Sequence, residues 1–337
     1  MKSLGEGARN LVENCMRIRP KEHVLIVTDE ARYKIGHSIS HAVKRITPNM
    51  EMYVLKNDEE RPHYELPREI VEAVERSNAS FWVTSEKHPY EMEDAFVDLA
   101  MKNKRRRHVH MSGITKQIME EEACVDYRGV EKFTDRVYDL VSGCKEIKIQ
   151  GQSDNKKRTN LSLEMNPKWK WVKCSGIIRK GEWDNWPSGE VCTTPYKVNG
   201  TILTTLLGDY FDGKYGILNP PVYFEVEDSR IVLDTLECGR DLNKELPPYL
   251  KTDENSDRVS EIGLPTNFKL IPKPKIGNIL RDEKARPHIG FGDPPDDRIG
   301  ANWSSRKHMD CLLEGCDLTV DGEPLIKDRR YLFNFIQ

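Results

Sequence analysis

The sequence predicts an α/β protein with an N-terminal, mostly parallel α/β domain and a β-rich C-terminal domain. Three observations lead to this prediction. Strand-like and helix-like apolar patterns alternate over the first 144 residues. Short strand-like runs separated by Gly, Pro, Asn and Asp then follow toward the C-terminal end. The length of 337 residues is sufficient for two domains, each with its own core.

The N-terminal part begins with a helix and a strand. Apolar residues recur at helical spacing over residues 5–18, and "HVLIVTDE" at 23–30 is a short β-branched run. The alternation continues with helices expected at 31–46, 67–78, 92–104 and 131–143, and strands at 50–56, 80–85 and 107–113. Strands that alternate with helices of this length are typical of βαβ units and a mostly parallel sheet. No Gly-x-Gly-x-x-Gly motif follows the first strand, so a dinucleotide site is not indicated.

The C-terminal part is expected to consist mainly of short strands. These strands are expected at 145–152, 159–166, 168–175, 201–211, 222–228 and 230–238. Helical patterns are few, and we expect one at 241–251 and a short helical turn at 259–263. Because the last N-terminal helix ends at Gly143, we place the domain boundary there, with domains at 1–144 and 145–337.

The composition excludes several classes of partner. The formal net charge is only -3, so no strong global field attracts nucleic acid or an anionic membrane. The basic run "KNKRRRHVH" at 102–110 is more typical of a helix end followed by a strand than of a nucleic-acid patch. No segment has the apolar length of a signal peptide or a membrane span. We therefore expect a cytoplasmic protein with no nucleic-acid partner and no membrane association.

The eight cysteines do not form a recognisable metal or disulfide pattern. No Cys-x-x-Cys pair occurs, and Cys311 and Cys316 lack a second pair that would complete a zinc site. We expect reduced, mostly buried thiols with a structural role.

A histidine and an aspartate two residues apart form the first candidate metal-binding motif. His308 and Asp310 lie in the segment "KHMD". If this segment is a strand, both side chains leave the same face, so an imidazole nitrogen and a carboxylate oxygen converge. The motif by itself is weak, because hydrogen bonding on a strand face produces the same pattern.

Three further residues have the chemistry to extend this motif. Glu190 follows a Pro-Ser-Gly turn, Glu261 precedes a glycine, and His288 begins a glycine-containing strand. Each has a structural alternative: a turn cap for Glu190, a helix-end carboxylate for Glu261 and a core position for His288. Together with His308 and Asp310, they form a balanced donor set for two divalent cations.

Five segments in this order resemble the thermophilic aminopeptidase T family of metallopeptidases. The segments are "NWPSGEVCTTP", "VNGTILTTLLGDYF", "SEIGLPTN", "GNILRDEKARPHIGFGD" and "HMD". The resemblance implies a dinuclear aminopeptidase, a hydrolase with two zinc, cobalt or manganese ions. It also implies that Glu190, Glu261, His288, His308 and Asp310 hold the ions, with a glutamate of this set as the bridge. A metal-bridging water would then hydrolyse the N-terminal peptide bond of a small peptide, and the protein would be a homodimer.

Two residues are candidates for a direct catalytic role. Glu261 is the candidate within the metal set. His88 follows the third predicted strand, and the carboxyl ends of parallel strands face ligand crevices. His88 is therefore a candidate general acid or base, with an interface or helix-start role as its alternative.

The sequence also departs from the family pattern and leaves two alternatives open. A tyrosine soon after the residue matching His288 is common in the family, whereas here no tyrosine occurs before Tyr331. The chain is also short for a family peptidase. One alternative is a mononuclear Fe(II) ring-cleaving enzyme, since 2,5-dihydroxypyridine dioxygenase is similar in length, carries a "WPSG" turn and has a His-x-Asp motif. The other alternative is a non-enzymatic binding protein on the same fold.

Overall fold

The structure is a computed structural model that describes residues 3–56, 64–85, 92–154 and 157–333. The chain divides into two compact units. The first unit consists of Met1–Glu131 and Cys174–Ser188, and the second of Lys132–Lys173 and Gly189–Gln337. The division into domains at 1–144 and 145–337 stays a prediction.

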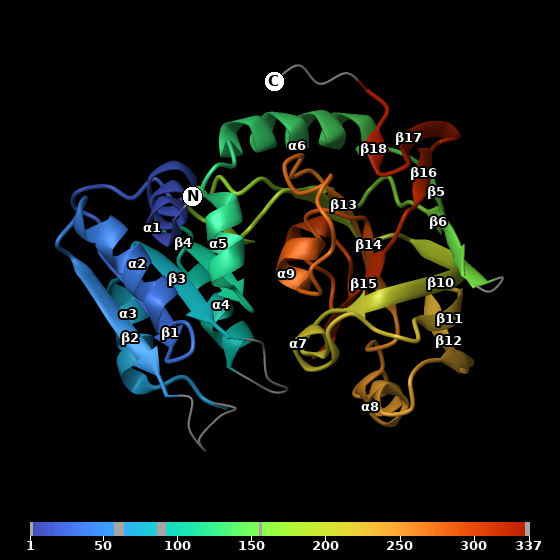
Figure 1. Cartoon of the computed structure of the whole chain (residues 1–337), viewed down its shortest axis with the longest axis horizontal. Coiled ribbons are helices and arrows are strands. Elements are labelled where there is room, and N and C mark those ends of the chain that lie inside the picture. Colours follow the sequence, from blue (N-terminus) through green and yellow to red (C-terminus); the bar gives the residue numbers. More distant parts are fainter. Residues whose placement is uncertain (1–2, 57–63, 86–91, 155–156, 334–337) are drawn as a thin grey trace. The chain divides into compact units, whose positions relative to one another are not determined.

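A five-stranded sheet forms the centre of the first unit. Its order is β2-β1-β3-β4-β8, and all neighbouring strands pair in parallel (blue to cyan for the first four strands in Figure 1). The strands are β1 (Val24–Asp29), β2 (Met50–Leu55), β3 (Ala79–Thr84), β4 (Arg107–Ser112) and β8 (Trp183–Asn185). The predicted α/β class with a mostly parallel sheet is therefore confirmed.

Helices precede, connect and follow the first four strands of this parallel sheet. They are α1 (Leu4–Arg9), η1 (Asn10–Cys15), α2 (Tyr33–Lys44), α3 (Arg68–Arg76), α4 (Glu93–Met101) and α5 (Lys116–Glu122). A long helix, α6 (Tyr127–Val141), begins in the first unit and ends in the second. Strands β1 and β3 are buried along their whole length, as expected for inner strands of a parallel sheet that is covered on both faces.

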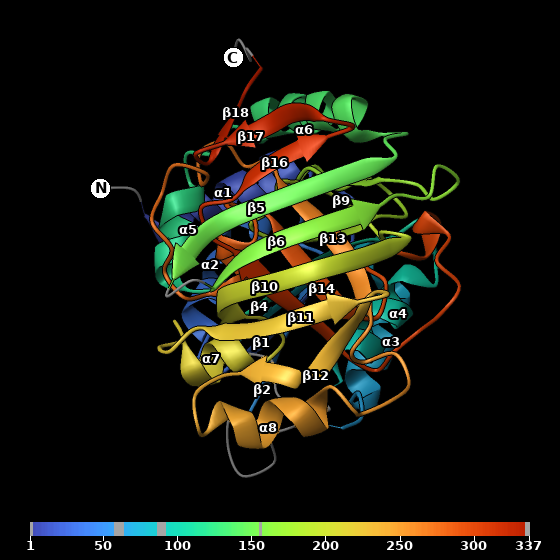
Figure 2. The same cartoon turned by 90° about the vertical axis from the view of Figure 1, so that its right-hand side faces the viewer.

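The second unit contains a large antiparallel sheet of 13 strands. Its main order is β18-β17-β16-β5-β6-β10-β15-β14-β13-β9-β7, with β11 and β12 added beside β10. Figure 2 shows β16, β5, β6, β10, β11 and β12 side by side. The strands are β5 (Glu146–Asp154), β6 (Lys157–Glu164), β7 (Val172–Cys174), β9 (Glu190–Thr193), β10 (Lys197–Leu207), β11 (Val222–Glu227), β12 (Arg230–Glu237), β13 (Val259–Pro265), β14 (His288–Gly292), β15 (His308–Leu313), β16 (Asp317–Val320), β17 (Glu323–Lys327) and β18 (Arg330–Tyr331).

Few helices accompany this antiparallel sheet, as the sequence predicts. They are α7 (Phe211–Tyr215), α8 (Leu242–Tyr249), α9 (Ile279–Asp282) and the 3₁₀ turn η2 (Asp297–Ile299). The helical turn expected at 259–263 is wrong, because this segment belongs to strand β13. Every residue of β13 is buried, so the alternation that identifies a half-exposed strand is absent there.

None of the helices in the described ranges has the length and apolar character needed to cross a lipid bilayer.

Candidate metal centre

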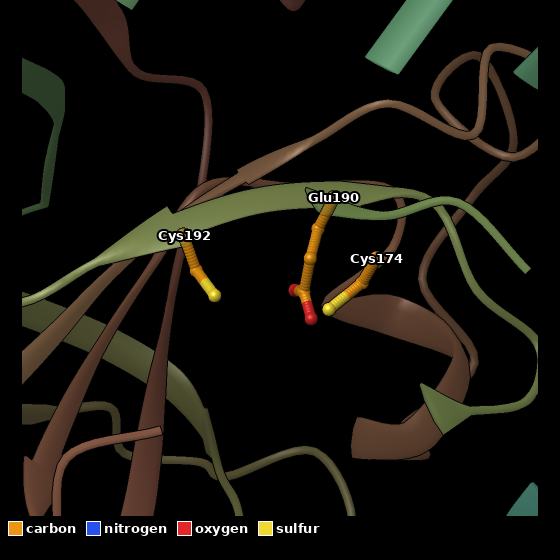
Figure 3. Close-up of side chains that lie close together, drawn as sticks. All are labelled: Cys174, Glu190 and Cys192. Atoms are coloured by element: carbon orange, nitrogen blue, oxygen red, sulfur yellow. The ribbon is translucent and has the colours of Figure 1, made fainter. Parts of the chain in front are cut away.

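The five candidate ligands lie on four neighbouring strands of the antiparallel sheet. The strands are adjacent in the order β15-β14-β13-β9. Glu190 is the first residue of β9, His288 of β14 and His308 of β15, while Glu261 lies within β13. Figure 3 shows Glu190 and Cys192 projecting from the same side of β9, as residues two apart on a strand must. Residues separated by 120 positions along the chain are thereby brought to one side of one sheet.

Strand register aligns two of the carboxylates across a glycine. Gly290 of β14 pairs with Glu261 on one side and with Asp310 on the other. A Cβ atom on Gly290 would lie 2.8 Å from Glu261 Cβ and 3.1 Å from Asp310 Oδ1. Because Gly290 has no side chain, the two carboxylates can approach each other above it.

A second glycine accommodates an imidazole ring. Gly263 of β13 pairs with His288 of β14. A Cβ atom on Gly263 would lie 2.1 Å from both Nε2 and Cε1 of His288. The imidazole of His288 therefore occupies the space that any other side chain at position 263 would fill.

The ligand atoms form two groups that share one carboxylate. Glu190, Glu261 and His288 form one group, in which the potential ligand atoms all lie within 4.8 Å of one another. Glu261, His308 and Asp310 form the other group by the same measure. Glu261 directs Oε1 toward His288 Nε2 at 3.7 Å and Oε2 toward His308 Nε2 at 3.1 Å. The carboxylate of Glu261 is thus the common member of both groups.

Each group is completed by a second contact between an imidazole and a carboxylate. His288 Nε2 lies 3.6 Å from Glu190 Oε2, and His308 Nε2 lies 3.4 Å from Asp310 Oδ1. Four of the five side chains are buried, whereas 31% of the His308 side chain is exposed. The cluster is therefore open to solvent on the side of His308.

Negative charge dominates the electrostatics of this cluster. Burial alone would lower the pKa of His288, but Glu261, Asp310 and Glu190 raise this pKa to about 10. Burial likewise opposes protonation of His308, yet Asp310 and Glu261 hold its pKa well above the usual value. The neighbouring imidazoles lower the pKa of Glu261 and of Asp310 despite the opposing effect of burial. An excess of carboxylate charge of this kind favours a bound cation.

Two buried carboxylate oxygens without a hydrogen-bond partner in the described ranges also make the donor set suitable for divalent cations. Among the described residues, no hydrogen-bond donor pairs with Glu190 Oε2 or Asp310 Oδ1, although both atoms are buried. A buried carboxylate oxygen without a partner is costly unless a cation compensates for it. Each group offers two carboxylates and one imidazole, which are ligand types used for zinc, manganese and cobalt.

Backbone carbonyls orient both imidazoles. Nδ1 of His308 lies 2.7 Å from the carbonyl oxygen of Asp293, and Nδ1 of His288 lies 3.5 Å from that of Arg286. When Nδ1–H donates to a carbonyl, the lone pair of Nε2 is directed toward the other ligands. Asp293 thus supports His308 through its main chain, while its carboxylate accepts a hydrogen bond from the Ser305 amide at 2.7 Å.

Comparison with known proteins assigns the chain to a family. The family model described as thermophilic metalloprotease (M29) matches residues 96–323, which is more than half of the chain. The chain belongs to the M29 metalloprotease family. The resemblance predicted from the sequence motifs is therefore confirmed, and metallopeptidases are the class to which this chain belongs.

Solved structures share the fold of this M29 chain. Wild-type AmpT from Thermus thermophilus aligns with a TM-score of 0.72 at 14% sequence identity, covering 98% of this chain and 99% of that chain. The structure of 2,5-dihydroxypyridine dioxygenase from Pseudomonas putida KT2440 aligns with a TM-score of 0.71, also at 14% identity, covering 98% and 96%. No curated protein matches the chain. At this identity, the two structural likenesses establish a common fold and leave the reaction open.

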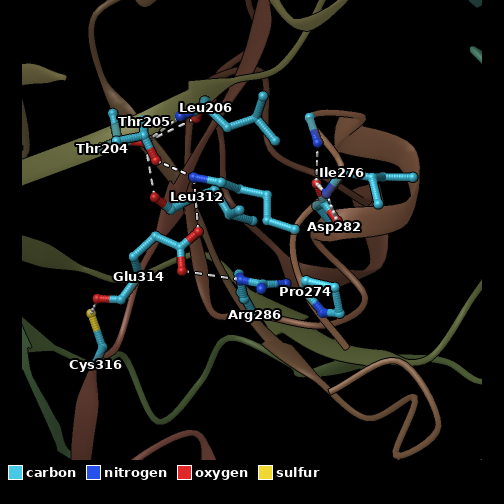
Figure 4. Close-up of polar contacts among 12 residues, drawn as sticks. Thr204, Thr205, Leu206, Pro274, Ile276, Asp282, Arg286, Leu312, Glu314 and Cys316 are labelled. Atoms are coloured by element: carbon cyan, nitrogen blue, oxygen red, sulfur yellow. Dashed lines mark hydrogen bonds and ion pairs between the residues drawn. The ribbon is translucent and has the colours of Figure 1, made fainter. Parts of the chain in front are cut away.

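An ion-pair network anchors the segment that precedes His288 in this M29 chain. Figure 4 shows the Glu314 carboxylate, which accepts a hydrogen bond from Arg286 Nε at 3.2 Å and pairs with Lys275 Nζ at 2.9 Å. The same figure shows Asp282, whose Oδ2 accepts hydrogen bonds from the amides of Ile276 at 2.9 Å and Gly277 at 2.8 Å. These contacts fix both ends of the loop and helix α9 ahead of strand β14.

Two charged residues lie beside the donor set, and one of them, Lys284, did not stand out in the sequence as a functional candidate. Glu283 and Lys284 follow helix α9 in the segment "RDEK", which has the composition of a solvated turn. In the structure, all four residues of this segment are buried. Lys284 Nζ donates to Glu190 Oε1 at 2.6 Å and lies 2.8 Å from Glu283 Oε1. Burial raises the pKa of Glu283 to about 8.

His88, the candidate general acid or base, lies outside the residues that the structure describes. Its catalytic role stays a prediction.

Proposed function

We propose that this M29 protein is a dinuclear metal-dependent aminopeptidase that hydrolyses the N-terminal peptide bond of small peptides. The observation that carries the proposal is the sharing of Glu261 by two groups of three potential ligands. Glu190 and His288 would complete one cation position, and His308 and Asp310 the other. Two cations would supply Lewis-acid polarisation of the scissile carbonyl and lower the pKa of an attacking water.

The protein's own residues would bind and orient the substrate at the solvent-accessible edge of the cluster. The free α-amine that only the first residue of a peptide carries would bind, in its neutral form, one of the cations held by Glu190, Glu261 and Asp310. The partly exposed side chain of His308 marks the side from which the peptide approaches. His88 would exchange a proton with the leaving amine. We retain a cytoplasmic homodimer as part of the proposal.

Replacement of Glu261 with Gln tests this function. The change keeps the size of the side chain but removes the charge that both groups share, so cleavage of aminoacyl p-nitroanilides should be lost. The cation content, measured by elemental analysis, should fall below the about two ions per chain expected for the wild type.

A matched control separates loss of function from loss of fold. Glu323→Gln makes the same chemical change at an exposed position at the start of β17, and should preserve full activity. Circular dichroism should be the same for both variants. Full activity in Glu261→Gln would show that the ligand assignment is wrong.

A mononuclear Fe(II) ring-cleaving dioxygenase is the second candidate function. The imidazoles of His288 and His308 both contact the Glu261 carboxylate, and two imidazoles with one carboxylate are the donor type of many non-haem iron oxygenases. The fold shared with 2,5-dihydroxypyridine dioxygenase agrees with this candidate. One iron per chain, with oxygen uptake in the presence of 2,5-dihydroxypyridine, would favour it over the aminopeptidase.

A further inference from the structure

The two ligand groups have the same donor chemistry but different surroundings. Each consists of two carboxylates and one imidazole, and Glu261 belongs to both. If the ligands alone set the affinity, two divalent cations would bind about equally well. The neighbours of Glu190 and Asp310 therefore decide whether the two positions differ.

Glu190 also lies beside the thiols of Cys174 and Cys192, and the charged neighbour that distinguishes its group is Lys284. Its Nζ donates a hydrogen bond to Glu190 Oε1 at 2.6 Å, and only 1% of its side chain is exposed. Its second carboxylate contact is Glu283 Oε1 at 2.8 Å. Helix α9 directly precedes Lys284 and is held in place by the hydrogen bonds that Asp282 accepts. The ammonium group is therefore fixed beside the donor set.

This contact gives the two carboxylate oxygens of Glu190 different partners. Oε1 accepts from Lys284, while Oε2 faces His288 Nε2 at 3.6 Å. Oε2 has no hydrogen-bond partner among the described residues and is available to a cation, whereas Oε1 already shares electron density with the ammonium group of Lys284. A buried ammonium also repels a divalent cation held by the same carboxylate, since Coulomb interactions are strong where water is excluded.

No ion pair with a lysine or arginine is present at the other group within the described residues. Asp310 Oδ1 faces His308 Nε2 at 3.4 Å and has no hydrogen-bond partner. His308 is also the exposed member of the cluster, with 31% of its side chain accessible. A cation that arrives from solvent therefore meets the Asp310 group first, where no lysine or arginine of the described residues forms an ion pair with the Asp310 carboxylate.

We infer that Lys284 makes the two cation positions unequal. The group of Glu261, His308 and Asp310 binds its divalent cation first and tightly, and the group of Glu190, Glu261 and His288 binds its cation second and weakly. This inference rests on the proposed dinuclear function and specifies how the site is loaded. Lys284 is a positioning residue that acts through Glu190.

Titration of the metal-free protein with Co²⁺ tests the inference without reference to activity. Visible absorption of bound cobalt and isothermal calorimetry should resolve two steps for the wild type. Lys284→Met removes the charge and retains the length of the side chain, so the weaker step should tighten at least about tenfold while the tighter step changes little. Lys284→Arg retains the charge and should keep the two steps apart.

Further variants assign the steps and control for general effects. Glu190→Gln should abolish the weaker step, and Asp310→Asn the tighter one. Lys197→Met removes a lysine that pairs with Asp228 instead of a donor, and should leave both steps unchanged. If Lys284→Met does not fold, as judged by circular dichroism, the neutral polar variant Lys284→Gln replaces it.

The outcomes distinguish this inference from the proposed function. Two equal steps in the wild type, or a weaker step that is unchanged or weakened in Lys284→Met, would overturn the role of Lys284 and leave the dinuclear site standing. Uptake of one ion or none by the wild type would instead overturn the dinuclear function itself.

Discussion

At the scale of single residues, the candidate centre depends on imidazoles held among carboxylates. His288 is buried between Glu190 and Glu261, at 3.6 and 3.7 Å from their nearest oxygens. This environment raises the pKa of His288 from 6.5 to about 10 in the absence of a cation. A neutral imidazole is the form that binds a metal, so a cation must displace the proton that these carboxylates retain.

The shift predicts how the stability of the metal-free protein depends on pH. Because the pKa of His288 is higher in the folded state, the protonated imidazole stabilises the fold fully below pH 6.5, and this contribution is lost as the pH rises toward 10. The melting temperature of the metal-free wild type should therefore fall over this range by more than that of His288→Gln. A parallel decline in the two proteins would contradict the charged state assigned to His288.

Lys284 shows why sequence analysis can miss a residue that lies beside a candidate site. Its segment is rich in charge, and charged runs are usually solvated. Only the buried position after α9 and the 2.6 Å contact with Glu190 identify it as a neighbour of the donor set.

At the scale of elements, the register of three antiparallel strands creates the centre. In β13, β14 and β15, the pairing of Gly290 with both Glu261 and Asp310 places two acids on one row. A shift of one residue would turn these side chains to the opposite face of the sheet. The glycines at 263 and 290 are therefore as necessary to the geometry as the ligands, because they leave space above the strands.

Gly263→Ala should damage the centre while it leaves the sheet intact. The new Cβ would lie 2.1 Å from His288 Nε2, so the imidazole must move away from Glu190 and Glu261. Displacement of a ligand should lower divalent-cation affinity by at least about tenfold, which a chelator-competition assay would measure.

Gly239→Ala is the matched control for this prediction. Its new Cβ would lie no closer than 3.8 Å to another residue, at Pro220 Cδ, so cation affinity should not change. Equal affinity in Gly263→Ala and the wild type would show that His288 is not a ligand.

At the scale of the whole molecule, the candidate ligands come from distant parts of one unit. The stretch from Glu190 to Asp310 contributes four strands to the cluster, and two cations bound there would together cross-link all four. An unfolded chain cannot hold its donors in this arrangement, so cation binding should stabilise the native state by mass action.

Removal of the cations should therefore lower the melting temperature. At a free cation concentration of 100 times Kd, a single site contributes about 2.7 kcal/mol to the free energy of unfolding. Differential scanning calorimetry with and without a chelator should show a decrease that added Zn²⁺ or Co²⁺ reverses. An unchanged melting temperature would favour a non-enzymatic binding protein on this fold.

Much of the fold was predictable, because the spacing of apolar residues along a segment indicates which of its faces is buried. The strand-like runs predicted at 23–30 and 80–85 form inner parallel strands, and the short strands predicted after residue 145 form an antiparallel sheet. Strand β8 at 183–185 was not predicted as part of the parallel sheet, since three residues carry no periodic signal. Strand β13 was partly mistaken for a helical turn because both of its faces are buried.

The sequence by itself determined the fold class, the family and the types of ligand atom available, because these depend on local patterns and on residue chemistry. Tertiary structure decided which carboxylate is shared, which glycines leave room for the ligands and which lysine contacts Glu190. Those features depend on strand register and on contacts between residues as far apart as Glu190 and Lys284. No local pattern in the chain encodes such distances, since they arise only when the strands pair.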